Sequence, residues 1–299
     1  MFTGCGTALV TPFYPDQSLD ERTLRELVRR QIDAGINFLV PCGTTGESPT
    51  LDHKEHLRVV EIVLEEAKGV VPVLAGAGGY NTAEVTQLAQ ELAVMGADGI
   101  LSVTPYYNKP TQEGLYQHYK VIASAINVPI VVYSVQGRTG INVEPATLKR
   151  LASIDNIIGV KEASGNISQQ ARVIHEVPEN FLVLSGDDSI TLPLIALGGR
   201  GVISVVSNQI PDAMTTLTRL ALEGNFAEAR KLQRKYLPLM EVNFVESNPI
   251  PVKAAMAMMG LLEPVWRLPM CAPQAASAAK IEAVLSDLQL LARSAHASR

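Results

Sequence analysis

Residues 156–165, NIIGVKEASG, combine the pattern of a buried strand with a lysine at its end. The largely apolar run 157–160 suits a strand covered on both faces in a parallel sheet, and Lys161 follows it directly. Apolar surroundings disfavour an ammonium ion, so we expect the pKa of Lys161 to fall from about 10.4 toward neutrality. A neutral amine can form a Schiff base with a carbonyl compound. A solvated lysine that only ends a strand is the alternative interpretation.

The same order of apolar run, polar glycine-rich loop and helical segment recurs along the chain. Expected strands lie at residues 7–10, 37–41, 71–75, 99–103, 130–133, 157–160, 181–184 and 202–206. Between them apolar residues recur at helical spacing, and Asp20, Asp52 and Thr82 stand at expected helix N-caps. Eight such units predict an α/β fold, the (β/α)8 TIM barrel. A doubly wound open sheet is the alternative, but no Gly-x-Gly-x-x-Gly follows the first strand.

The strand pattern ends near Gly224. We therefore expect residues 1–224 to form the barrel and residues 225–299 to form a C-terminal helical domain. Apolar spacing in the second part predicts helices over residues 226–244, 251–262 and 273–291. These helices could cover the barrel or build a subunit contact.

Composition restricts the classes of function. The 299 residues carry a net charge of -5, which disfavours nucleic acid and anionic membrane surfaces as partners. No uncharged apolar run approaches the roughly 18 residues of a membrane span, and the first residues lack the pattern of a secretory signal. Cys5, Cys42 and Cys271 have no metal-like spacing, so we expect free thiols and a cytoplasmic protein.

Active sites of such barrels lie in the loops after the carboxyl ends of the strands, which we call the mouth. Seven candidate residues for chemistry follow expected strands there: Thr44, Thr45, Tyr106, Tyr107, Tyr133, Arg138 and Lys161. Phenols can relay protons, a guanidinium can hold a carboxylate with two hydrogen bonds, and a glycine-rich loop can present N–H groups to an anion. The set suits an α-keto acid bound to the amine and a second substrate with its own carboxylate.

Each of these residues also has a purely structural interpretation. The glycine-rich loop at Thr44 could be an ordinary turn, Tyr106 and Tyr107 could pack at a rim or subunit contact, and Tyr133 could be a core tyrosine. Three further features are weaker. The pair His53-x-x-His56 lacks a third metal ligand, and Asp187-Asp188 suits a helix cap better than magnesium. Lys253 is expected to be solvated, or to snorkel with its charged end in solvent.

Four motifs together resemble the dihydrodipicolinate synthase / N-acetylneuraminate lyase family: Gly43-Thr44-Thr45-Gly46-Glu47, Thr104-Pro105-Tyr106-Tyr107-Asn108, Gly137-Arg138-Thr139-Gly140 and Gly159-Val160-Lys161-Glu162-Ala163. The resemblance extends nearly from end to end, including residues 185–188 and 248–253. It implies a class I lyase without a cofactor, in which pyruvate forms a Schiff base with Lys161. The resulting enamine would attack aspartate-4-semialdehyde, in the diaminopimelate route of lysine biosynthesis.

The resemblance also implies roles for single residues. Tyr133 would transfer protons over the Schiff base, and Thr44 would link it to Tyr107 from a neighbouring subunit of a homotetramer built as a dimer of dimers. Thr45 would hold the pyruvate carboxylate and Arg138 the semialdehyde carboxylate. Gly186 and Ile203 would contribute backbone beside the Schiff base.

The sequence departs from the family pattern in two places. Ser134 and Gln136 replace Asn and Pro in the usual Asn-Val-Pro-Gly-Arg-Thr-Gly, which puts the placement of Arg138 in question. An allosteric lysine site is implied at Ser48, His53, His56, Tyr80, Glu84 and Tyr106. There Tyr80 replaces a common asparagine and Pro49 a small residue, so we expect weak or absent inhibition by lysine.

Two other functions compete with the condensation. A pyruvate aldolase, such as N-acetylneuraminate lyase or a 2-keto-3-deoxy sugar acid aldolase, would use the same barrel and Lys161, but usually lacks the arginine of Gly-Arg-Thr-Gly. A non-catalytic scaffold would keep the barrel and lose the chemistry. The joint presence of Lys161, Tyr133, Thr44, Tyr107 and Arg138 speaks against it.

Overall fold

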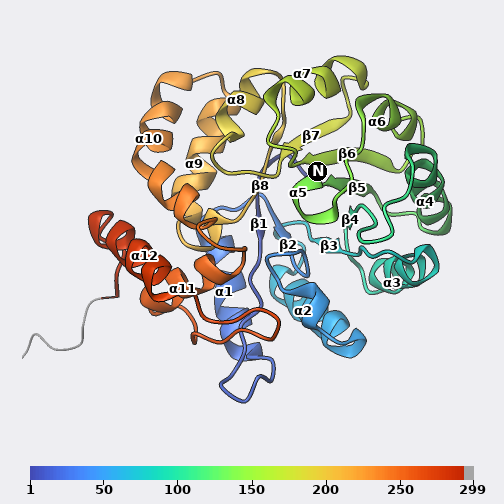
Figure 1. The fold of residues 1–299 in the computed structure, drawn as a ribbon. Helices are drawn as coiled ribbons and strands as arrows, with labels where there is room; N and C mark the ends of the chain where they lie inside the picture. Colours follow the sequence, from blue (N-terminus) through green and yellow to red (C-terminus); the bar gives the residue numbers. More distant parts are fainter. Residues whose placement is uncertain (293–299) are drawn as a thin grey trace, which may run out of the picture.

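The computed structural model describes residues 1–292, so residues 293–299 of the expected C-terminal segment lie outside it. Within this range eight parallel strands form one sheet: β1 (Gly4–Ala8), β2 (Phe38–Val40), β3 (Leu74–Gly76), β4 (Gly99–Val103), β5 (Ile130–Ser134), β6 (Ile157–Glu162), β7 (Leu182–Ser185) and β8 (Gly201–Ser204). Their order is β2-β1-β8-β7-β6-β5-β4-β3, and a parallel bridge between Leu39 and Val73 joins the two ends. The sheet is a closed barrel, which confirms the predicted (β/α)8 fold (Figure 1).

Helices surround the barrel on its outer side (Figure 1). The main ones up to residue 222 are α1 (Glu21–Asp33), α2 (His53–Ala67), α3 (Thr82–Val94), α4 (Gln112–Ala125), α6 (Pro145–Leu151), α7 (Ile167–Glu176), α8 (Thr191–Ala196) and α9 (Pro211–Leu222). Short turns of helix lie in the loops as η1 (Ser48–Thr50), α5 (Gln136–Thr139) and η2 (Val206–Asn208). Asp20 and Asp52 cap α1 and α2 as expected, whereas the side chain that caps α3 belongs to Asn81 and not to Thr82.

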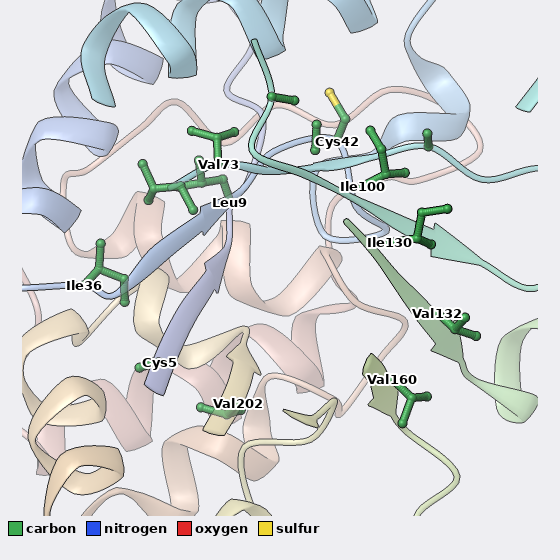
Figure 2. Close-up of a cluster of buried hydrophobic side chains, with 14 of the residues drawn as sticks. Cys5, Leu9, Ile36, Cys42, Val73, Ile100, Ile130, Val132, Val160 and Val202 are labelled. Atoms are coloured by element: carbon green, nitrogen blue, oxygen red, sulfur yellow. The ribbon is translucent and has the colours of Figure 1, made fainter. Parts of the chain in front are cut away.

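Alternation along the strands separates two hydrophobic clusters. Outward-facing residues such as Ile130, Val132 and Val160 pack between the strands and the helices (Figure 2). Their neighbours Val131 and Tyr133 belong to a second cluster, with residues such as Leu184 and Ile203 from the facing strands. Successive side chains of a strand point to opposite faces, so this second cluster fills the barrel interior. The same alternation turns Lys161 inward, beside Tyr133.

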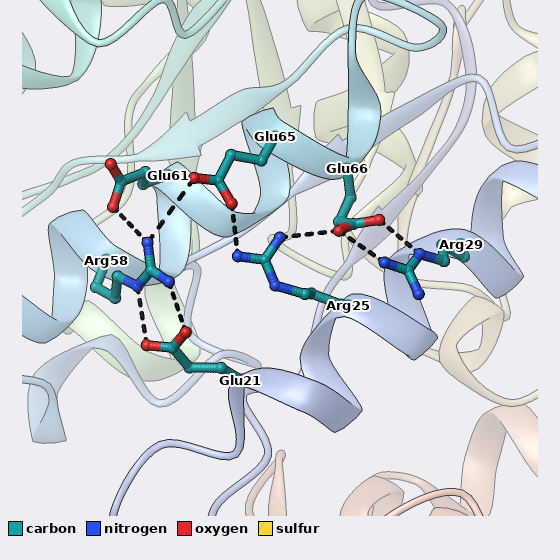
Figure 3. Close-up of polar contacts among 7 residues, drawn as sticks. All are labelled: Glu21, Arg25, Arg29, Arg58, Glu61, Glu65 and Glu66. Carbon is teal, nitrogen blue, oxygen red and sulfur yellow. Dashed lines mark hydrogen bonds and ion pairs between the residues drawn. The ribbon is translucent and has the colours of Figure 1, made fainter.

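Charged residues tie α1 to α2 at the surface. Arg58 pairs with Glu21 and Glu61, while Arg25 and Arg29 share Glu66, at distances of 2.6 to 2.8 Å (Figure 3). Isolated exposed ion pairs contribute about 0–1 kcal/mol, and networks of shared partners are the more favourable case. This network fixes the helix that follows the loop of Thr44 and Thr45.

Between residues 225 and 292 the chain forms three helices, α10 (Phe226–Val242), α11 (Ile250–Met258) and α12 (Ala275–Asp287), close to the three predicted segments. They pack against α8, α9 and one another beside the barrel (Figure 1). The division into two domains at residue 224 stays a prediction. Among residues 1–292, none of the helices combines the length and the apolar character that crossing a membrane requires.

The expectation of a solvated Lys253 was wrong. Its side chain is fully buried, and its Nζ lies 2.5 Å from a carboxylate oxygen of Glu47 and 4.4 Å from the ring centre of Phe13. The backbone N–H of Arg267 donates to the other carboxylate oxygen of Glu47 at 3.2 Å. The guanidinium of Arg267 stacks on Phe13, with its Cζ 4.2 Å from the ring centre. Removing an ion from water is costly, which is why Lys253 is found with a carboxylate. The pair fastens α11 to the loop that carries Thr45.

Candidate active site

Lys161 lies near the carboxyl end of β6 and is only 5 % exposed. Its Nζ is 4.1 Å from the centre of the Tyr133 ring. Burial lowers the pKa of Lys161 from 10.5 to about 7; the positive charge of Arg138 adds to the effect, and the carboxylate of Asp188 opposes it. About half of the amine is therefore neutral at pH 7, which is the state that a nucleophile needs.

Tyr133 is the partner of Lys161 in the register between β5 and β6. Burial raises the pKa of its phenol, while Arg138 and a hydrogen bond with the Thr44 side chain partly offset the rise. The phenol therefore keeps its proton at neutral pH and can pass it along a hydrogen-bonded hydroxyl. Lys161, Tyr133 and Thr44 form one group at the mouth.

Thr45 and Arg138 are linked through Asn248, a residue from the loop before α11. The side-chain amide of Asn248 donates to the Thr45 hydroxyl oxygen at 2.9 Å. Arg138 donates to the backbone carbonyl of Asn248, also at 2.9 Å. The two groups expected to hold carboxylates thus lie on either side of one residue.

Gly186 directly follows β7, the strand beside β6, and Ile203 lies on β8, which pairs with the other side of β7. The Gly186 N–H donates to the carbonyl of Glu162 at 2.8 Å, and a Cβ at position 186 would stand 2.6 Å from that of Ala163. A larger residue at position 186 would displace residues 162 and 163, which directly follow Lys161. Ile203 is fully buried in β8, and its side chain belongs to the inner cluster that includes Tyr133.

Asp188 is buried beside this group, where sequence patterns suggested a helix cap. Its Oδ2 accepts from the backbone N–H groups of Val205 at 3.1 Å and Val206 at 2.8 Å, so it braces the turn after β8 and does not cap α8. Burial raises the pKa of Asp188 to about 6, against the opposing effect of these N–H groups and Ser204. Above that pH its charge favours the protonated form of Lys161.

Tyr107 is not brought to the others within one copy of the chain. Its side chain is 90 % exposed, on a backbone with φ of 69° that non-glycine residues seldom adopt. It lies in the loop after β4, at the same end of the barrel as Tyr133.

A cavity of about 620 Å³ opens beside the mouth. Thr44, Tyr133 and Arg138 line one part of it. All six residues of the expected allosteric site line it as well: Ser48, His53, His56, Tyr80, Glu84 and Tyr106. The two predicted sites are therefore neighbours in space. The ring of Tyr80 packs edge-on against Tyr106, with centres 5.3 Å apart.

The two histidines of this cavity have partners of their own. His56 Nε2 lies 2.9 Å from the carbonyl of Gly76, and His53 lies 2.7 Å from a carboxylate oxygen of Glu91. Burial lowers the pKa of His56, so it is neutral at pH 7. Among residues 1–292, no cluster of three or more His, Cys, Asp or Glu side chains is arranged to hold a metal ion.

Comparison with known proteins decides the family. The sequence profile of the Dihydrodipicolinate synthetase family matches residues 1–288. The chain belongs to this family. It is 54 % identical over 289 residues to the 4-hydroxy-tetrahydrodipicolinate synthase of Koribacter versatilis, with 96 % of each chain covered. Dihydrodipicolinate synthase from Aquifex aeolicus superposes with a TM-score of 0.96 at 42 % identity, over 98 % of this chain and all of the other.

A further solved member of the dihydrodipicolinate synthetase family contains pyruvate. It is the chloride-inhibited dihydrodipicolinate synthase of Acinetobacter baumannii complexed with pyruvate. It superposes with a TM-score of 0.96 at 40 % identity, covering 97 % of this chain and all of that one.

Ser134, one of the departures from the family pattern, faces away from the mouth. It is 1 % exposed, donates to Asn142 at 3.3 Å and accepts from the backbone N–H of Val143 at 3.2 Å. Gln136 begins the short helix α5, which carries Arg138. Arg138 keeps its bond to Asn248 in this context.

Sequence reasoning missed the roles of Asn248, Glu47 and Lys253. All three stood inside motifs that carried the resemblance to this family, and that was the one available signal. Asn248 contacts a residue 203 positions away in the chain, and Lys253 one 206 positions away. No local periodicity reports a contact of that range.

Proposed function

We propose that this chain condenses pyruvate with L-aspartate-4-semialdehyde to 4-hydroxy-tetrahydrodipicolinate, the first committed step of diaminopimelate and lysine biosynthesis. The observation that carries the proposal is the buried amine of Lys161, which has a pKa of about 7 and packs against Tyr133. It occurs in a chain that belongs to the Dihydrodipicolinate synthetase family. The enzyme is a class I lyase of the aldol type.

The reaction begins at the amine. Neutral Lys161 attacks the keto carbon of pyruvate, and loss of water leaves an imine. Loss of a proton from the pyruvate methyl group gives an enamine, whose carbon attacks the aldehyde of the second substrate. The amino group of that substrate then attacks the imine carbon, closes the ring and releases Lys161.

We assign the proton transfers of these steps to Tyr133. It packs on the amine and is hydrogen-bonded to Thr44, so a proton can travel along the hydroxyls. We place Tyr107 of a second copy next in this relay, because within one copy its phenol is exposed.

The two carboxylates of the substrates are assigned to separate groups. The hydroxyl of Thr45 and the loop N–H groups beside it hold the pyruvate carboxylate. Arg138 holds the carboxylate of the semialdehyde with paired hydrogen bonds. Gly186 and Ile203 supply backbone beside the imine.

The assembly follows from the same assignment. We infer a homotetramer built as a dimer of dimers, with residues 225–292 as a helical extension beside the barrel. The free thiols of Cys5, Cys42 and Cys271 fit a reducing cytoplasm. Free lysine binds weakly at most in the cavity lined by His53, Glu84 and Tyr106, because Tyr80 fills part of it.

A coupled assay tests the function. Pyruvate and aspartate-4-semialdehyde, with a reductase that consumes the product, should give turnover, and N-acetylneuraminate should give none. The retained Arg138 supports the condensation over the sugar-acid aldolase. Cleavage of N-acetylneuraminate without condensation would reverse the assignment, and inactivity toward both would favour a scaffold.

A further inference from the structure

Asn248 occupies an unusual place between the two carboxylate-binding groups. It is 4 % exposed and belongs to the segment that leads into α11. In the sequence it lies 203 positions from Thr45 and 110 from Arg138. Its side chain contacts Thr45 and its backbone contacts Arg138. Among the described residues its Oδ1 has no hydrogen-bond partner, so the side chain has one polar contact, with the Thr45 hydroxyl.

We propose that Asn248 is a positioning residue for pyruvate, which sets the polarity of the Thr45 hydroxyl and acts on the substrate through it. This inference rests on the proposed function, since Thr45 is taken there as the group that holds the pyruvate carboxylate.

The argument concerns which way a hydroxyl donates. A hydroxyl has one proton and two acceptor lone pairs. Because the amide N–H of Asn248 donates to Thr45 Oγ1, one lone pair is occupied and the proton must point elsewhere. A carboxylate can only accept, so a hydroxyl committed to donating is the arrangement that binds it. Asn248 thus prepares Thr45 for an anion before the anion arrives.

Arg138 contacts the backbone carbonyl of Asn248, an acceptor that every residue at this position also carries. Substitutions of the side chain therefore separate the two substrates. Removing the amide should weaken pyruvate binding and leave the semialdehyde largely unaffected. A general loosening of the mouth would weaken both.

The experiment uses the intact enzyme and the variants Asn248→Ala and Asn248→Asp. Borohydride trapping on Lys161 gives the half-saturating pyruvate concentration without the second substrate, and steady-state kinetics gives KM for each substrate. Losing one neutral hydrogen bond costs about 1 kcal/mol, so Asn248→Ala should raise the half-saturating pyruvate concentration about fivefold. Asn248→Asp should be worse than Ala, because a carboxylate accepts the hydrogen bond that the Thr45 hydroxyl would otherwise donate to pyruvate, and it repels the substrate anion.

Two further variants separate positioning from structure. In a Thr45→Val background the change Asn248→Ala should have almost no further effect on pyruvate, because the group it acts through is gone. Asn243→Ala is the matched control. Asn243 is a fully buried amide of the same C-terminal region, paired with Gln209 at 2.8 and 3.2 Å. Its loss should lower stability and leave the pyruvate requirement unchanged.

The outcomes decide between the inferences. Equal increases in both KM values, additive effects with Thr45→Val, or rescue by Asn248→Asp would overturn the role of Asn248. Normal trapping of pyruvate by the wild type without turnover of the semialdehyde would refute the condensation alone and leave the trapping comparison valid. An absence of any pyruvate adduct in the wild type would refute both.

Discussion

The acid limb of the pH profile should report the environment of Lys161. Burial lowers the pKa of this amine from 10.5 to about 7. At about 1.36 kcal/mol per pKa unit, the buried site disfavours the charged amine by about 5 kcal/mol. At pH 7 about half of the amine is neutral, against about one part in 3,000 for an unperturbed lysine, which is a gain of about 1,500-fold in reactive nucleophile.

Asp188→Asn is the perturbation that tests this electrostatic account. The Asp188 carboxylate raises the pKa of Lys161, opposing burial, and it is ionised above about pH 6. Asparagine has the same shape and can still accept from Val205 and Val206. An opposite charge at close range shifts a pKa by about 1 unit or more, so the variant should stay active to a pH about 1 unit lower.

The assay measures the rate at which pyruvate forms a borohydride-trapped adduct between about pH 5 and pH 9. An amine with a pKa of about 7 is almost fully charged at the lower limit and almost fully neutral at the upper one. In the wild type the rate should rise with pH through a midpoint near 7. Asp187→Asn is the matched control, since the Asp187 carboxylate is occupied by the N–H and hydroxyl of Ser189. A wild-type midpoint near 10, or the same midpoint in Asp188→Asn, would refute the reasoning.

Three further outcomes are expected. Lys253→Met should cost about 3–5 kcal/mol in urea unfolding because Glu47 is left buried without its partner, and adding Glu47→Gln should restore much of the loss; a loss below 1 kcal/mol would contradict this. Tyr107→Phe should lower turnover on the order of tenfold or more with little change in Tm, and unchanged turnover would remove it from the proton relay. Lysine should give half-inhibition only above about 1 mM in initial-rate assays, a binding free energy weaker than about 4 kcal/mol, because Tyr80 packs on Tyr106 in that cavity; inhibition at lower concentrations would contradict it.

Much of the barrel could be predicted because its signals are local. Strands such as Ile157–Glu162 and Gly99–Val103 can be predicted from short apolar runs, and the candidate site residues lie at or after their carboxyl ends. Lys161 and Tyr133 could be paired in advance for this reason. The cap of α3 was placed one residue late, at Thr82, because Asn81 and Thr82 are both good caps and only the backbone decides between them.

The parts that could not be predicted depend on contacts between distant segments. Lys253 looks like an exposed helical lysine until Glu47 and Phe13 are seen around it. Asp188 looks like a cap, yet its carboxylate is taken by N–H groups after β8. Asn248 has no local pattern at all. The role proposed for Tyr107 requires a second copy of the chain, which no pattern within one chain can place.

The most direct test of the central claim is a mass measurement. The enzyme is incubated with pyruvate, reduced with borohydride and digested, and the peptide that contains Lys161 is weighed. The account predicts the mass of one reduced pyruvate adduct on that peptide and none in Lys161→Arg. An adduct on another lysine, or no adduct at saturating pyruvate, would contradict it.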